Sequence, residues 1–355
     1  MVPEHSTTPN RAEVYEARRR SVPRRSRRGS LVARVLTPLS WIYGGAALLG
    51  RRRHERTAAR VERPVISIGN ITCGGTGKTP VVEMTARHLL AMGRRPAILT
   101  RGYRAPPGSD KNDEMRVLES NLPGVPQYRC SDRRAGAREA IAAGADVLLL
   151  DDGFQHARLA RDLDIVLIDA LSPFAGGRVL PAGLLREPLR VLDRAHLLGI
   201  TRSNLVEGRT LAVLESYLRG RFPRAARVLI ETVPLRWVSL EGPSALPESL
   251  RGERALVVCA IGNPEAFRRD VAGLGVEVAE LVSFRDHHAY TPGDVEKLSR
   301  RAEELGARAV IMTQKDAVKL PVGPATSRWK YLLIESRVTR GADVYEAAIA
   351  GALRS

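Results

Sequence analysis

Short apolar runs rich in β-branched residues alternate with longer amphipathic segments from residue 64 to the end of the chain. The first five apolar runs cover residues 65–68, 97–100, 147–150, 165–168 and 196–200. Runs of this length are typical of strands that are buried on both faces of a sheet. The segments 81–92 and 133–143 have the spacing of amphipathic helices. This order predicts an α/β fold with a mainly parallel sheet and helices on both of its faces.

The pattern changes between residues 222 and 255. Two predicted strands are followed there by a segment rich in Pro, Gly and Ser, and new apolar runs then cover residues 256–261, 309–313 and 331–334. A chain of 355 residues is long enough for two cores. We therefore predict a larger α/β domain at 61–222, a β-strand linker at 223–254 and a smaller α/β domain at 255–355.

The formal net charge of +17 is concentrated at the front of the chain. Residues 1–60 contain 14 Arg and no Lys against four Glu, so about +10 of the charge belongs to a sixth of the chain. Pro, Ser and Arg dominate residues 3–30, so the segment 1–33 cannot bury enough apolar surface to fold alone. We expect a basic, disordered arm there. Because the excess charge lies in a tail and only 5% of residues are aromatic, no nucleic-acid partner is expected.

An apolar segment at 35–49 lies between Arg34 and the arginines at 51–53. A membrane-spanning helix needs about 20 apolar residues, so this segment is too short for a comfortable span. We expect residues 34–60 to form a membrane-associated helix with a basic flank. Trp41 and Tyr43 would lie at headgroup depth, and the arginines would contact anionic lipid. A buried first helix and a secretory signal peptide remain alternatives, the latter disfavoured because it would place a nucleotide-binding loop outside the cell.

That loop is the glycine-rich sequence at 72–79, which follows a predicted strand and precedes a predicted helix. Three glycines allow the backbone to wrap around a polyphosphate, and the positive end of the helix adds to anion binding. Lys78 would reach the β- and γ-phosphates, and the Thr79 hydroxyl would bind Mg²⁺. Thr72 stands where the usual motif has its first glycine. A glycine-rich turn without a ligand is the alternative.

Two further groups of residues are candidates for chemistry. Asp151 and Asp152 end a predicted strand, where a carboxylate can hold a metal beside the phosphate loop. If the strand continues through both residues, their side chains point to opposite faces. Asp286, His287 and His288 share a predicted loop, where a histidine could orient a carboxylate base. A solvated carboxylate pair and a loop without catalytic function are the alternatives.

The cysteines favour a reducing compartment. Cys73, Cys130 and Cys259 are widely spaced and odd in number, which argues against a disulfide framework and against a zinc site. Cys73 lies in the phosphate loop and is interpreted as a small residue.

The order of the motifs resembles a known family. GGTGKTP, TRGY, NDE, DDGFQH, GRVLPAGLLREPL, AIGNPEAF, DHHAY and TQKDAVK follow one another as they do in the tetraacyldisaccharide 4′-kinases of lipid A biosynthesis. The resemblance runs from about residue 34 to the C-terminus, and the family's loop also begins with Thr. It implies transfer of the ATP γ-phosphate to the 4′-hydroxyl of a tetraacylated glucosamine disaccharide 1-phosphate. The implied location is the cytoplasmic face of the inner membrane, reached peripherally or monotopically through residues 34–53, with no obligate protein partner.

The resemblance also implies roles for individual residues. Asp113 matches the general base and His287 its partner, and Lys78 is the third catalytic residue. The ATP site is expected at Thr72, Cys73, Gly74, Gly75, Thr76, Gly77, Lys78 and Thr79, the Mg²⁺ site at Thr79, Asp151 and Asp152, and the substrate site at Arg101, Arg133, Gln155, His156, Arg178, Arg186 and Glu187.

The chain departs from the family pattern at two positions. Asn112 replaces a glycine, and Gln314 replaces a glutamate, so no required acid is expected at 314. Lys315 and Asp316 are interpreted as a structural salt bridge. A second function remains open, namely a phosphate-loop ATPase or GTPase that switches a partner and needs neither Asp113 nor His287.

Overall fold

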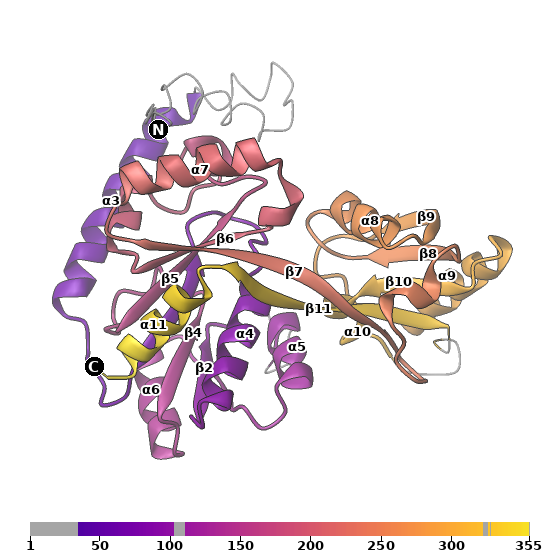
Figure 1. Ribbon diagram of the computed structural model, residues 1–355, viewed down its shortest axis with the longest axis horizontal. Helices are drawn as coiled ribbons and strands as arrows, with labels where there is room; N and C mark the ends of the chain where they lie inside the picture. The colour runs from indigo at the N-terminus through magenta and orange to yellow at the C-terminus, as the bar shows by residue number, and fades with distance from the viewer. Residues whose placement is uncertain (1–34, 103–110, 322–325, 327, 355) are drawn as a thin grey trace, which may run out of the picture. The chain divides into compact units, whose positions relative to one another are not determined.

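The computed structural model describes residues 35–102, 111–321, 326 and 328–354. The basic arm expected at 1–33 lies outside these residues. The chain forms two compact units, and Figure 1 labels their helices and strands. Unit 1 comprises the chain up to Arg101, Val125–Glu231 and the chain from Ser336 onward, and unit 2 comprises Gly102–Gly124 and Thr232–Glu335.

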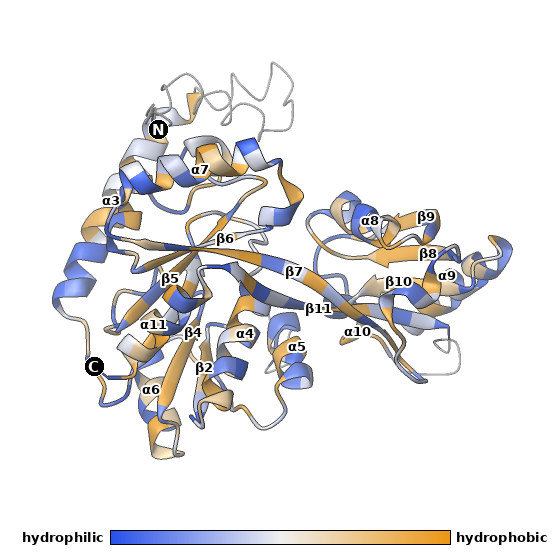
Figure 2. Cartoon of the chain, viewed as in Figure 1, coloured by the Kyte–Doolittle hydropathy of each residue, from blue (hydrophilic) through white to orange (hydrophobic). Residues whose placement is uncertain are grey.

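Unit 1 contains a parallel sheet with the strand order β3-β2-β4-β1-β5-β6-β7. Each neighbouring pair in this order is parallel. The strands are β1 (Val65–Asn70), β2 (Pro96–Thr100), β3 (Gln127–Arg129), β4 (Val147–Asp151), β5 (Leu163–Asp169), β6 (Leu197–Thr201) and the first part of β7 (Ala226–Ser239). The apolar runs that predicted strands therefore form the centre of the sheet, and Figure 2 shows them as largely hydrophobic.

Helices cover both faces of this sheet, as the sequence predicts. Ala137 and Ala140 of α6 (Arg133–Ala142) pack with Leu148. Leu218 of α7 (Gly208–Arg221) packs with Val166. In the strand register, Leu148 and Val166 share one face, so the alternate residues of the same strands face the other side. There α4 (Lys78–Ala91) contacts β1 and β4, and α11 (Ala342–Ala352) contacts β5. The connections also contain the short helices η1 (Ala175–Gly177), η2 (Leu189–Arg194) and η3 (Ser203–Leu205).

Unit 2 contains a second parallel sheet, in the order β11-β10-β8-β9. Its strands are β8 (Arg254–Cys259), β9 (Glu277–Ser283), β10 (Ala309–Thr313) and the first part of β11 (Trp329–Arg340). Alternate residues of β8 face two separate cores, one closed by α8 (Pro264–Gly273) and the other by α9 (Pro292–Glu304). The unit also holds α5 (Asp113–Asn121), η4 (Pro247–Leu250) and α10 (Gln314–Ala317).

The structure divides the chain differently from the predicted domains. The first difference is that β7 is one long strand, where the sequence pattern predicts a pair. The second is that α5 belongs to unit 2 although it is flanked in sequence by strands of unit 1. Asn121 exchanges two amide hydrogen bonds with Gln314, and Lys315 forms an ion pair with Glu114, so polar contacts to α10 hold α5 in unit 2. The C-terminal helix α11 belongs to unit 1, because Tyr345 is buried and donates to Thr85 of α4.

Residues Thr37–Arg56 form α3, which lies against the body of unit 1 along one side. The Ser40 hydroxyl donates to the Val179 carbonyl (2.9 Å), and Gly44 lies against Pro188. Among the described helices, none combines the length and the apolarity needed to cross a bilayer.

Candidate active site

The loop between β1 and α4 has the backbone of an anion-binding site. Gly77 is the N-cap of α4 with φ +80°, and Gly74 has φ +118°, so both occupy conformations that side chains disfavour. Gly77 has no side chain with which to cap the helix, so the N–H groups of the first turn are left for an anion. The amide of Asn70 donates to the Thr72 carbonyl (2.8 Å), and the N–H of Cys73 donates to the Leu184 carbonyl (2.7 Å), which fixes the start of the loop.

The residues of this loop and the Asp152 carboxylate suit a phosphate and a cation. A Cβ added at Gly75 would meet no atom within 4 Å. Two buried oxygens, Thr76 Oγ1 and Asp152 Oδ1, have no hydrogen-bond partner within the described residues. Thr79 is buried in the first turn of α4. A glycine-rich loop, a carboxylate oxygen that accepts no hydrogen bond and a threonine have the chemistry of a magnesium–phosphate site.

Lys78 is one member of a ring of polar contacts. Its Nζ lies 3.7 Å from Asp152 Oδ1 and 3.4 Å from Asn70 Oδ1. Asp152 Oδ2 accepts from Arg186 Nη1 at 2.7 Å, and Arg186 also reaches Gln155 Oε1 at 3.4 Å. Gln155 closes the ring by donating to the Asn70 carbonyl at 2.7 Å. Burial pushes the pKa of Asp152 upward, but Lys78 and Arg186 outweigh it, so the pKa lies below its ordinary value and the carboxylate is ionised at neutral pH.

The two adjacent carboxylates differ because the strand ends between them. β4 ends at Asp151, and Asp152 has φ +55°, so the alternation of strand side chains does not extend to Asp152. A Cβ added at Gly69 would lie 2.6 Å from Phe154 Cβ, and one added at Gly153 would lie 2.8 Å from Ser67 Oγ of β1. These close approaches press the Asp152 turn against β1, next to the phosphate loop.

Arg133 and His156 contact the backbone on either side of Asp152. Arg133 is buried and donates to the Cys130 carbonyl (2.5 Å) and the Asp151 carbonyl (3.3 Å), so it braces the end of β4. Burial lowers the pKa of His156 to about 4, with Arg133 and Arg161 acting in the same direction. The imidazole is therefore neutral at neutral pH, and its Nε2 has no hydrogen-bond partner among the described residues.

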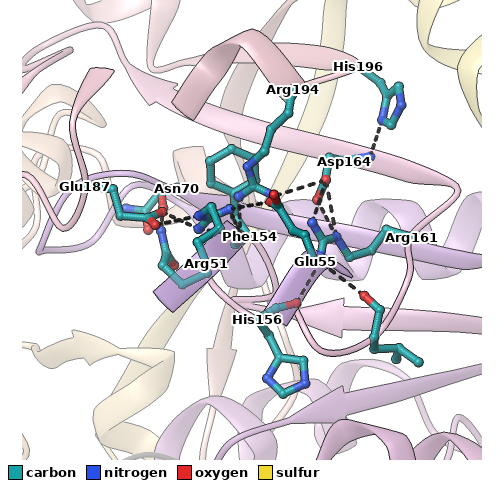
Figure 3. A network of polar contacts seen from close by, with 12 residues as sticks. Arg51, Glu55, Asn70, Phe154, His156, Arg161, Asp164, Glu187, Arg194 and His196 are labelled. Atoms are coloured by element: carbon teal, nitrogen blue, oxygen red, sulfur yellow. Dashed lines mark hydrogen bonds and ion pairs between the residues drawn. The ribbon is translucent and has the colours of Figure 1, made fainter. Parts of the chain in front are cut away.

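The side chain of Glu187, which the family resemblance places in the substrate site, pairs with Arg51 of helix α3. Arg51 of α3 donates to Glu187 through Nε (2.8 Å) and Nη2 (2.5 Å), and both side chains are about 6% exposed. The same guanidinium donates to the Phe154 carbonyl. Arg194 also donates to that carbonyl and stacks 3.6 Å from the centroid of the Phe154 ring. Figure 3 shows Arg51, Glu187 and Arg194 gathered around Phe154. Glu187 thus holds α3 against the Asp152 turn.

Unit 2 contains a carboxylate–histidine pair. Asn112 accepts from the Met115 N–H and so caps α5, which places Asp113 at the first position of the helix. Asp113 Oδ2 lies 3.0 Å from Nδ1 of His287. His287 has φ +64° in the loop after β9, and its N–H donates to the Ala260 carbonyl (3.3 Å). The structure therefore brings together two residues that are 174 positions apart in the sequence.

Two lysines lie near this pair, and only Lys319 contacts it. Lys319 Nζ lies 3.4 Å from Asp113 Oδ2 and 3.1 Å from Asp316 Oδ1. Lys315 instead pairs with Glu114 at 2.7 Å. The interpretation of Lys315 and Asp316 as a salt bridge with each other is therefore wrong, because each has a different partner. Burial raises the pKa of Glu114, but Lys315 outweighs that effect and the net pKa is lowered.

Two of the residues expected in the substrate site have no described place in these clusters. Arg101 and Arg178 are exposed. Sequence reasoning missed Asn70 and Lys319. Asn70 had a usable signal, since it is a polar residue at the carboxyl end of a strand that leads into the phosphate loop, whereas only the register of α10 reveals Lys319.

No group of three or more His, Cys, Asp or Glu side chains is placed to hold a metal anywhere in the described ranges. A magnesium ion bound through one or two carboxylates, a hydroxyl and substrate phosphates does not need such a group.

Known proteins are similar to this chain over most of its length. The family model for tetraacyldisaccharide-1-P 4′-kinase matches residues 32–354. The tetraacyldisaccharide 4′-kinase of Anaeromyxobacter sp. (strain K) is 39% identical over 358 residues, covering 93% of this chain and 94% of that protein. The same enzyme of Parvibaculum lavamentivorans is 38% identical and covers 89% of this chain and 88% of its own length. The crystal structure of LpxK from Aquifex aeolicus in complex with ATP has a TM-score of 0.70 at 24% identity, over 91% of this chain and 99% of that one. The chain belongs to the tetraacyldisaccharide-1-phosphate 4′-kinase family.

Proposed function

We propose that the chain transfers the γ-phosphate of ATP to the 4′-hydroxyl of a tetraacylated glucosamine disaccharide 1-phosphate, in lipid A biosynthesis. The observation that carries the proposal beyond nucleotide binding is the Asp113–His287 pair. A hydroxyl acceptor must lose its proton as it attacks phosphorus, and a positioned carboxylate can accept that proton. A switch ATPase or GTPase without a lipid acceptor would not need this pair, so the kinase is favoured.

Unit 1 binds the nucleotide in this proposal. The N–H groups of the loop and of the first turn of α4 surround the phosphates, and the Lys78 ammonium compensates their charge. Thr79 and Asp152 would hold Mg²⁺, with Asp151 behind them at the end of β4. Bound there, Mg²⁺ would supply positive charge that compensates the negative charge developing on the phosphate groups. Arg186 keeps Asp152 oriented and ionised.

Unit 2 accepts the proton. The 4′-oxygen forms a bond to the γ-phosphorus as the bond from that phosphorus to the bridging oxygen of ADP breaks. ADP leaves with the electron pair, and the hydroxyl proton passes to Asp113. His287 orients the carboxylate through Oδ2 and stabilises it when it is ionised.

The test is direct. Purified full-length protein is incubated with ATP, Mg²⁺ and the disaccharide 1-phosphate in detergent, and the lipid is analysed by mass spectrometry. We expect a mass gain of one phosphate that depends on ATP. Equal phosphate release with and without the lipid would instead identify an ATPase.

We also propose that α3 binds an anionic membrane surface, at the cytoplasmic face of the inner membrane. The helix is docked through Ser40, Gly44 and Arg51. On the opposite side lie the exposed side chains of Leu39 (53%), Ile42 (70%) and Leu49 (68%). Exposed Trp41 and Tyr43 flank them, and the exposed arginines 52, 53 and 56 continue the surface toward the end of the helix. Apolar residues next to a basic cluster are typical of a helix that lies in the membrane interface.

Replacing Leu39, Ile42 and Leu49 together with Gln should weaken binding to anionic vesicles by about tenfold or more, because apolar area would no longer be removed from water. Vesicle flotation at several protein concentrations measures this. The matched control replaces the exposed Leu90, Leu205 and Leu246 with Gln and should bind as the wild type does. Equal binding by both variants would show that α3 is not the membrane contact.

A further inference from the structure

We propose that Lys319, held by Asp316, is a positioning residue that fixes the Asp113 carboxylate with one oxygen directed to the acceptor hydroxyl. This inference rests on the proposed kinase function, in which Asp113 accepts a proton.

Lys319 lies in the interior of unit 2. It follows α10, and its side chain is 9% exposed. Its ammonium contacts Asp113 Oδ2 (3.4 Å) and Asp316 Oδ1 (3.1 Å), and it lies 5.6 Å from the centroid of the Tyr290 ring. A buried ammonium is unfavourable unless it is compensated, and here two carboxylates from α5 and α10 compensate it.

Asp316 connects both members of the carboxylate–histidine pair. It is fully buried, and its Oδ2 accepts from the Ala260 N–H (3.2 Å) and from Thr313 Oγ1 (2.6 Å). The carbonyl of Ala260 in turn accepts from the N–H of His287. One rigidly held carboxylate therefore supports Lys319 on one side and the His287 loop on the other.

The contacts at Asp113 select one of its two oxygens. His287 Nδ1 and Lys319 Nζ both contact Oδ2, at 3.0 and 3.4 Å. Neither contacts Oδ1, which can therefore accept the hydroxyl proton. A base that is oriented in advance loses less freedom in the transition state, and a misplacement of about 1 Å can lower a rate about 100-fold.

The choice of lysine suits this position. The chain has only six lysines among its 56 basic residues, so arginine is its usual cation. The compact ammonium of a lysine can lie between two carboxylates, whereas the planar guanidinium of arginine favours a paired, two-oxygen contact that would also engage Oδ1.

The charges around Lys319 predict a pH effect. Asp113 faces it from α5, Asp316 from α10, and His287 and Tyr290 from the loop after β9. Asp286 lies 3.8 Å from His287 Nε2, and the Glu114–Lys315 pair adds no net charge. Without the ammonium, Asp113 would share the site with the buried Asp316. The ionised form of Asp113 would then be less favourable.

The experiment compares Lys319→Met with wild type and with Lys297→Met, an exposed lysine on α9 of the same unit. The readouts are kcat with the lipid, KM for ATP, the pH dependence of kcat/KM and the unfolding temperature. For Lys319→Met we expect kcat to fall about 10- to 100-fold with KM for ATP unchanged. We also expect the acid limb of the pH profile to move up by about one unit or more. Lys297→Met should match the wild type, and Lys319→Arg should keep the acid limb of the wild type.

An unchanged acid limb in Lys319→Met would overturn the proposal and leave only a structural role. If Lys319→Met does not fold, Asp316→Asn decides the question, because removal of a neighbouring negative charge should move the acid limb to lower pH, and an unchanged limb contradicts the proposal. A wild type that does not phosphorylate the lipid would refute the kinase function itself, whereas an active wild type with unshifted variants refutes only the role of Lys319.

Discussion

Replacing Asp113 with Asn should lower kcat with the lipid acceptor by about 10² to 10⁴-fold. The amide has nearly the same shape as the carboxylate but cannot take the hydroxyl proton, and it cannot form an ion pair with Lys319. ATP binding should be unchanged, because the phosphate loop belongs to unit 1 and Asp113 to unit 2. Steady-state kinetics gives kcat, and calorimetric titration gives nucleotide affinity.

The matched control is Glu119→Gln, at the other end of the same helix. Glu119 is exposed and forms an ion pair with Lys111 at 2.6 Å, so its loss should change kcat little. The double variant Asp113→Asn/His287→Ala should be barely slower than the Asp113 variant, because two residues that act as a unit lose their contribution together. Equal losses of kcat and of ATP affinity in Asp113→Asn would place Asp113 outside the chemistry.

The proposed nucleotide site of unit 1 was predictable because its residues are local in sequence. Consecutive apolar residues defined β1, the glycines defined the loop, and Lys78 and Thr79 follow directly. Asp151 and Asp152 come at the end of the next strand in the sheet, and parallel strands bring their carboxyl ends to one edge. The different directions of the Asp151 and Asp152 side chains were not predictable, because they depend on the positive φ of Asp152.

The Asp113–His287 pair of unit 2 depends on contacts between distant segments. Nothing in the periodicity of residues 113–121 shows that this helix leaves the first sheet and packs on α10. That arrangement follows from the reciprocal amide pair of Asn121 and Gln314, which also explains why an amide replaces the family's glutamate. A glutamate at 314 could not donate to Asn121. The Asp113–His287 pair was expected only from the order of the motifs, because no spacing rule connects residues so far apart.

Glu187 has a partner that its motif does not reveal. It lies beside Arg186, which pairs with Asp152, yet its own side chain points to Arg51 of α3. Successive residues of one segment thus have two different partners, one the carboxylate that we propose to bind Mg²⁺ and the other the helix that we propose to contact the membrane. The same Arg51 donates to the carbonyl of Phe154, two residues after Asp152. The docking of α3 and the position of the Asp152 turn therefore depend on the same buried contacts.

Replacing Arg51 with Met should destabilise unit 1 by about 3 to 5 kcal/mol, because Glu187 would be left as an uncompensated buried charge. The Phe154 carbonyl would still accept from Arg194. For a unit of this size the change corresponds to a fall in unfolding temperature of about 6 to 20 °C. Thermal unfolding followed by circular dichroism measures it.

Two further variants separate the buried charge from the loss of a surface arginine. Arg53→Met removes an exposed arginine from the same helix and should change the unfolding temperature little. The double variant Arg51→Met/Glu187→Met removes both charges and should regain most of the lost stability, because apolar residues of similar size often replace a buried ion pair without loss. A double variant as unstable as Arg51→Met would mean that the hydrogen bonds to Phe154, and not the charge of Glu187, hold α3 in place.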